Sequence, residues 1–162
     1  MSDTVTLHFE SRLQASRTEL WQWITSVQGI RSEMRPLLTM TMPKGISSLA
    51  ELTMAPGQRL FRSYILLFGF LPADYSDLTL LELRDGEGFT EQSPMGSMKL
   101  WRHERNILPC PDDSHTLLLS DRLVFQPRLA KRLSCWLVGQ LFTHRHQVLR
   151  KHFGTTQPQN ML

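Results

Sequence analysis

The sequence TLLLSDRLVFQPRLAKRLSCWLVGQLFTHRHQVLRKHF, residues 116–153, joins a strand pattern to a long helix pattern. Thr116–Phe125 is rich in β-forming residues, and Pro127 suits the first turn of a helix, where its missing N–H costs nothing. Apolar residues then recur every three or four positions, which predicts one amphipathic helix of about 25 residues and about 38 Å, ending at Gly154. The expected apolar stripe consists of Leu133, Leu137, Leu141, His144 and Val148, flanked by Leu129, Trp136 and Leu149.

The N-terminal part predicts one strand followed by two short helices. Val5–Leu13 alternates apolar and polar residues, which indicates a half-buried strand. Ser16 and Glu19 have the spacing of a capping box, so a helix begins after Ser16. Gly29 marks the expected joint to a second helix, which stops before Pro36 because a residue preceding proline avoids helical angles.

The middle of the chain predicts an antiparallel meander. Residues 39–47 look like a loop, and short turns at Pro56-Gly57, Pro72-Ala73-Asp74 and Asp85-Gly86 separate β-rich runs. The expected strands are Leu49–Met54, Arg59–Leu71, Leu78–Leu83, Phe89–Ser93 and Met98–Leu108, followed by the strand Thr116–Phe125. Strands joined by short turns favour antiparallel pairing over parallel βαβ units, so the fold class is α+β.

Composition limits the classes of function. The chain has 162 residues, which suits one domain, expected over residues 1–154, with a flexible C-terminal tail at 155–162. The net charge of +3 is spread along the chain, which does not favour DNA binding. Cys110 and Cys135 are too few for a disulfide framework or a zinc site. There is no signal-peptide pattern and no apolar run long enough to cross a membrane, so we expect a cytoplasmic protein.

The order of elements and several local motifs resemble the SRPBCC superfamily, which has the START-like, birch-pollen-allergen-like helix-grip fold and includes polyketide cyclases and lipid-transfer domains. The motifs are Phe9 with Ser11, Trp21, Gly29-Ile30 ahead of Pro36, Gly57, Gly88–Ser93, Trp101–Arg105, Thr116–Phe125 and Leu141–His146. The resemblance spans about residues 4–153. It implies a curved antiparallel sheet of about six to seven strands wrapped around the long C-terminal helix, with two short helices after strand 1. It also implies a cavity between sheet and helix, but no particular reaction.

One candidate site is the alternating set Trp101, His103 and Arg105, which share a face if 98–108 is a strand. Facing the cavity, Trp101 could stack on a ring, Arg105 could hold a carboxylate or phenolate, and His103 could act as a general acid or base. Alternatively, His103 and Arg105 form a structural ion pair with Glu91 or Asp121, because a buried charge needs a partner.

Further candidates are weaker. Glu91 and Asp121 could act as paired carboxylates if they lie close together. His144 could line the pocket, but His144 and His146 are two residues apart on a helix and point away from each other, so no metal site is expected. The apolar residues expected to line the pocket or its mouth are Phe61, Phe68, Leu137 and Leu141.

The leading hypothesis is a protein that binds or carries a small hydrophobic or aromatic molecule, as a monomer or weak homodimer. No phosphate-binding glycine loop is present, so no cofactor is expected. One alternative is a cyclase, dehydratase or hydrolase acting on an aromatic or polyketide-like substrate, with His103 as the catalytic residue. Another is a protein- or ribosome-interaction module, which predicts an exposed apolar patch rimmed by basic residues.

Overall fold

A computed structural model describes residues 3–52 and 55–155. The chain begins with strand β1 (Val5–Leu13), followed by helices α1 (Arg17–Thr25) and α2 (Val27–Met34). The capping box is present, since the Ser16 hydroxyl accepts from the Glu19 amide and the Glu19 carboxylate accepts from the Ser16 amide. The joint between the two helices is Ser26, which caps α2 through the Gly29 amide, so the expectation of a joint at Gly29 was wrong by three residues.

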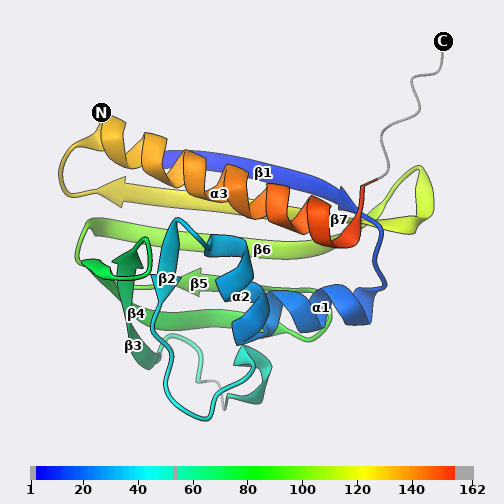
Figure 1. Cartoon of the computed structure of the whole chain (residues 1–162), viewed down its shortest axis with the longest axis horizontal. Coiled ribbons are helices and arrows are strands. Elements are labelled where there is room, and N and C mark those ends of the chain that lie inside the picture. The colour runs from blue at the N-terminus through cyan, green and yellow to red at the C-terminus, as the bar shows by residue number, and fades with distance from the viewer. Residues whose placement is uncertain (1–2, 53–54, 156–162) are drawn as a thin grey trace.

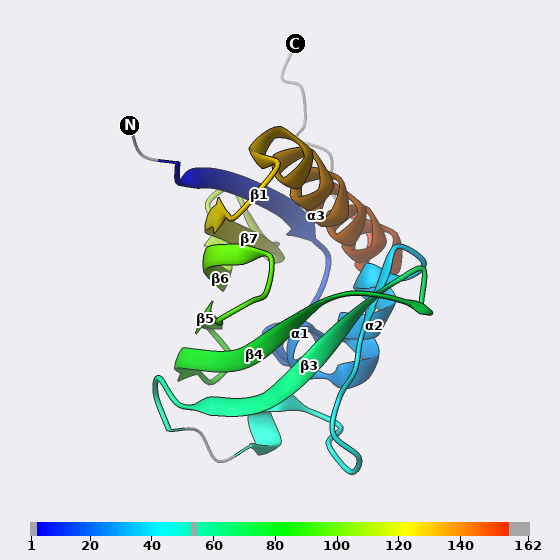
Figure 2. The same ribbon diagram turned by 90° about the vertical axis from the view of Figure 1, so that its left-hand side faces the viewer.

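Seven antiparallel strands form one sheet in the order β1-β7-β6-β5-β4-β3-β2. After α2 the strands are β2 (Leu38–Met40), β3 (Arg59–Leu67), β4 (Leu71–Arg84), β5 (Gly88–Gln92), β6 (Met98–Cys110) and β7 (Asp113–Pro127). The sheet curls, and helix α3 (Lys131–Phe153) crosses its concave side (Figures 1 and 2). Helix α2 packs against α3, and the predicted helix-grip arrangement is confirmed.

The β3–β4 hairpin differs from the predicted pattern. Arg59–Leu71 is not one strand, because the chain turns at Phe68 (φ 53°) and Gly69 (φ 83°). These two residues belong to a three-residue loop, 68–70, between the paired residues Leu67 and Leu71, in which the Phe70 amide donates to the Leu67 carbonyl at 3.2 Å. Pro72 does not close the strand but lies within β4, opposite Leu66 and beyond the part of β4 that pairs with β5. The missing N–H of Pro72 is tolerated there.

Three other expected boundaries were wrong. Leu49–Glu51 forms a short 3₁₀ helix capped by the Ser48 hydroxyl, not a strand, and Met54 lies outside the described residues. Residues 38–40 form β2, where a loop was expected to begin. Pro127 ends β7, paired with Met98, and α3 begins only at Lys131. Of the tail expected at residues 155–162, residues 156–162 also lie outside the described residues.

The buried face of α3 is rotated relative to the predicted stripe. Its buried residues are Val138, Phe142, Arg145, His146 and Leu149. Leu133 and Leu137 are instead 56% and 50% exposed. The buried face is displaced from the predicted stripe by roughly one residue, which is about 100° around the helix axis. The prediction followed the leucines, whereas two charged or titratable residues, Arg145 and His146, occupy the interior.

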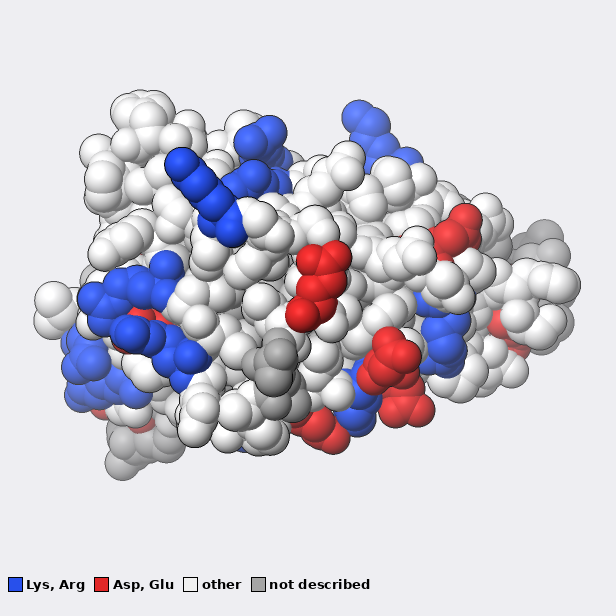
Figure 3. All heavy atoms as spheres, turned by 90° about the horizontal axis from the view of Figure 1, so that it is seen from below, with Lys and Arg blue, Asp and Glu red and all other residues white. Residues whose placement is uncertain are grey.

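The surface carries mixed charge. Figure 3 shows the side seen from below, where acidic residues lie among the basic ones. Arg59 and Arg62 of β3 flank Asp77 of β4, with nitrogen–oxygen distances of 3.5 and 2.7 Å. Within the described residues, no helix has the length and apolar content needed to cross a membrane.

Candidate functional site

Strand β6 presents Trp101, His103 and Arg105 to the concave side of the sheet. Antiparallel register places Trp101 opposite Phe125 and Arg105 opposite Asp121. His103 and Arg105 are buried, and the rings of Trp101 and His103 both contact Phe142 of α3. The three residues therefore share the face that looks toward the long helix.

Arg105 is the centre of a buried ion network. Its Nε and Nη2 each donate to Asp121 at 2.7 Å, and its Nη1 donates to Glu33 of α2 at 2.8 Å. Arg145 of α3 donates from Nε to the same Glu33 carboxylate at 3.1 Å, and Trp23 Nε1 of α1 does so at 3.1 Å. All three guanidinium nitrogens of Arg105 are therefore bonded to carboxylates, which leaves little capacity for a ligand.

Two histidines complete the network on Asp121. His103 Nε2 donates to Oδ1 of Asp121 at 2.7 Å, and His146 Nε2 donates to Oδ2 at 2.8 Å. On its other side, His146 Nδ1 lies 2.7 Å from Ser11 Oγ of β1. We define the buried ion network as Ser11, Glu33, His103, Arg105, Asp121, Arg145 and His146. It joins α2, α3 and three strands, so it holds the helix layer on the sheet.

Ser11, His146 and Asp121 are the residue types of a nucleophilic triad, connected in the same order. However, Ser11 is only 4% exposed, and its oxygen already accepts a hydrogen bond from Arg150 Nη1 at 2.8 Å. A substrate carbonyl has no approach to an oxygen buried in this way. The geometry is that of a structural hydrogen-bond chain.

The charges in the network shift one another's pKa values. Burial disfavours ionised Asp121, but the charges and hydrogen bonds of Arg105 and His103 outweigh burial and hold the pKa of Asp121 well below its usual range. Burial also acts against the charge on Arg105, yet Asp121 and Glu33 raise its pKa. For Arg145, burial and then repulsion from Arg105 lower the pKa, so this guanidinium is the less well compensated of the two.

The region beside the network is apolar. Trp101 packs with Phe125 and Phe142, at ring-centroid distances of 5.8 and 6.3 Å. Leu141 contacts two core clusters, one built around Phe142 and one around Met34 and Leu78, and Phe61 of β3 packs against the second. Trp101, Phe61 and Leu141 are only partly buried, although they pack against the core.

Of the remaining predicted residues, Glu91 lies at the edge of the network, and the others lie apart from it. Glu91 accepts from the Ser93 hydroxyl at 2.7 Å and lies 3.8 Å from His103 Nδ1, so His103 stands between Glu91 and Asp121. His144 Nε2 donates to the backbone oxygen of Arg35 at 2.6 Å. Phe68 is exposed at the hairpin turn, and Leu137 is half exposed. A ligand-binding role for each of these residues stays a prediction.

Glu33, Arg145, His146 and Ser11 were not singled out as a site by sequence reasoning. Glu33 lies in a short helix, and nothing local shows that it is fully buried. A usable signal was the spacing Val138, Phe142, Arg145 and Leu149, which continues an apolar helical face through a charged residue. Within the described residues, no group of three His, Cys, Asp or Glu side chains could hold a metal ion.

Comparison with known proteins places the chain among helix-grip proteins. CV1439 from Chromobacterium violaceum is similar in structure, with a TM-score of 0.67, 12% identity and coverage of 93% of this chain and 99% of that one. A START superfamily protein from Mycobacterium smegmatis has a TM-score of 0.63, 10% identity and coverage of 91% and 96%. XoxI from Bacillus cereus has a TM-score of 0.62, 13% identity and coverage of 92% and 95%.

At these identities the likeness shows the fold and not the ligand. Among curated proteins, no significant match to the sequence was found. A family model does match residues 11–153, which include the whole buried ion network. The chain therefore belongs to the family described as Domain of unknown function (DUF8410), and it has the START-like helix-grip fold.

Proposed function

We propose that the protein binds a small hydrophobic or aromatic molecule between the concave face of the sheet and the N-terminal half of α3. The observation that carries this proposal is the partial exposure of Trp101, Phe61 and Leu141. Inward-facing apolar residues from three elements would be sealed in a fully packed core. Apolar surface with few polar groups is the usual lining of a small-molecule site.

The buried ion network would form the closed end of this site. Arg105 has no free nitrogen, so we assign the anion-binding role expected of it to Arg145. The Arg145 Cζ atom lies 4.9 Å from the centroid of the Phe142 ring. Of the three guanidinium nitrogens of Arg145, only Nε has a hydrogen bond to a described residue, which is Glu33. A ligand with a carboxylate or phenolate could accept from Nη1 and Nη2 of Arg145 while its apolar part contacts Trp101.

Native mass spectrometry of protein purified without additives tests the proposal. We expect an extra mass that is released on denaturation and recovered in an organic extract. Arg145→Gln should reduce the bound fraction if the ligand is an anion, and Arg132→Gln on the exposed start of α3 is the matched control. An empty wild-type mass, combined with no ligand uptake from a library of aromatic acids and fatty acids, would contradict the proposal.

A second candidate function, a protein-interaction module, is favoured by one separate observation. Leu129, Leu133 and Trp136 are 82%, 56% and 60% exposed at the start of α3. Arg128, Lys131 and Arg132 are exposed beside them. This is the apolar patch with a basic rim that such a module needs, and it suits an acidic protein surface.

Affinity capture with wild-type protein and Trp136→Glu separates this candidate from ligand carriage. A partner retained by the wild type and lost by the variant would support an interaction surface. Capture that is identical for both proteins would remove the patch from consideration.

A further inference from the structure

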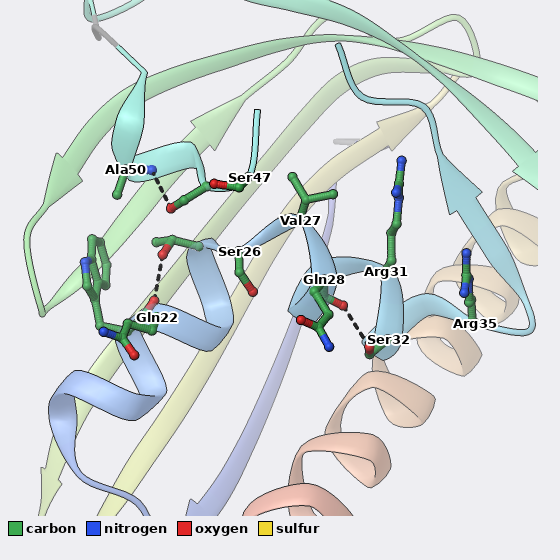
Figure 4. Close-up of a pocket in the computed structure, with 12 residues that line it drawn as sticks. Gln22, Ser26, Val27, Gln28, Arg31, Ser32, Arg35, Ser47 and Ala50 are labelled. Atoms are coloured by element: carbon green, nitrogen blue, oxygen red, sulfur yellow. Dashed lines mark hydrogen bonds between the residues drawn. The ribbon is translucent and has the colours of Figure 1, made fainter. Parts of the chain in front are cut away.

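An open pocket of about 770 Å³ lies between α1, α2 and residues 47–50, on the outside of the helix layer (Figure 4). Its lining is rich in hydroxyl and amide side chains, including Gln22, Gln28, Ser32 and Ser47. It is separate from the ligand site proposed above. Glu33 of α2 is buried in the ion network, whereas Arg31, two residues earlier on the helix, lines this pocket.

The pocket is positively charged. Arg31 and Arg35 are its only charged lining residues among those the structure describes. Figure 4 shows both side chains extending from α2 in the same direction. Within the described part of the chain, neither guanidinium has a hydrogen bond or ion pair, and Nε of Arg31 is buried without a partner.

The unpartnered Nε means that the Arg31 guanidinium is not compensated by the described part of the protein. Buried polar groups are normally hydrogen-bonded, and exceptions call for an explanation. Val27 and Gln28, in the first turn of α2, also line the pocket, and Arg35 lies at the C-terminal end of the same helix, so the pocket runs along α2. The neighbouring carboxylate of Glu51 accepts from the Ser47 hydroxyl at 2.7 Å and does not contact either arginine.

We infer that this pocket binds a small phosphate ester with a polar body. A phosphate dianion matches two guanidinium groups in charge, and arginine donates to phosphate oxygens in pairs. The hydroxyl and amide groups around the arginines suit a sugar or polyol, because they can donate and accept hydrogen bonds, and Trp21 and Val27 in the lining can contact its carbon atoms. A hydrophobic ligand would leave both arginines uncompensated.

The test is an NMR titration of isotope-labelled protein with glucose 6-phosphate, inorganic phosphate and glucose. We expect glucose 6-phosphate to shift the amide signals of residues 26–35 and 47–50 in a saturable way. Inorganic phosphate should shift the same signals more weakly, and glucose should not. The double variant Arg31→Gln/Arg35→Gln should weaken binding at least about tenfold.

Lys99→Gln is the matched control, because it removes one positive charge from an exposed position on β6, away from the pocket. The spectrum of the double variant also reports whether the fold is intact. The inference is overturned if glucose binds as well as its phosphate, or if the double variant binds as well as the wild type. It is also overturned if neither phosphate shifts the pocket signals at up to about 10 mM.

Discussion

Asp121 is the residue on which the buried ion network depends. It accepts hydrogen bonds from Arg105, His103 and His146, and it is fully buried. Asp121→Asn would leave Arg105 with only the Glu33 carboxylate. Loss of one partner in a buried ion pair costs about 3–5 kcal/mol. We expect the variant to lose that much unfolding free energy at pH 7, measured by urea denaturation.

The same variant tests the electrostatic origin of this contribution. The folded-state pKa of Asp121 lies below its unfolded value, so its stabilisation is present above about pH 4 and is lost as pH falls through the folded-state pKa. The stability difference between wild type and Asp121→Asn should therefore narrow in acid. Glu104→Gln is the control, since Glu104 pairs with Arg102 on the outer side of β6, and it should cost less than about 1 kcal/mol. A difference in unfolding free energy between wild type and Asp121→Asn that is equal at pH 3 and pH 7 would contradict this account.

At the residue scale, part of the network was predictable. Alternation along residues 101–105 put Trp101, His103 and Arg105 on one face, and the need of a buried arginine for a carboxylate pointed to Glu91 or Asp121 without deciding between them. Which face turns inward depends on the register with β7, which a single strand does not encode. Glu33 is 72 residues from Arg105 in the sequence, and only the packing of α2 on α3 brings them together.

At the element scale, α3 turns Phe142 inward and Leu137 outward. Phe142 is 1% exposed and contacts Phe9, Trp101 and His103. Phe142→Ala should therefore lower the unfolding free energy by about 3–5 kcal/mol in chemical denaturation, because it opens a cavity. Leu137→Ala on the same helix should cost less than about 1 kcal/mol. Similar losses for the two variants would mean that α3 faces the sheet with the predicted leucine stripe.

Helices and most strands were predictable because their signals are local. The Ser16 capping box and the alternation of Val5–Leu13 each use neighbouring residues, and both were confirmed. The β3–β4 turn was missed because Phe68 takes a left-handed conformation, where asparagine or aspartate would have been the usual signal. The buried face of α3 was predicted wrongly because the interior of this protein is partly charged. A stripe chosen by hydrophobicity alone lies about 100° around the helix axis from the face that is buried.

At the scale of the whole molecule, the interior divides into two parts along α3. The C-terminal half of the helix is tied to the sheet by the ion network, and the N-terminal half meets partly exposed apolar side chains. Relatives of 10–13% identity share this architecture. Because so few side chains are shared, the likeness shows the fold alone, and ligand binding must be tested by experiment.

The most direct test of the proposed site is a fluorescence titration with the neutral apolar probe N-phenyl-1-naphthylamine. Leu141 joins two core clusters beside the proposed site, so Leu141→Trp should fill the space between helix and sheet. We predict saturable binding by the wild type and at least about tenfold weaker binding by Leu141→Trp. Leu133→Trp, on the exposed side of α3, should bind as the wild type does. Absence of saturable binding by the wild type, or equal binding by Leu141→Trp, would contradict a ligand site between the sheet and α3.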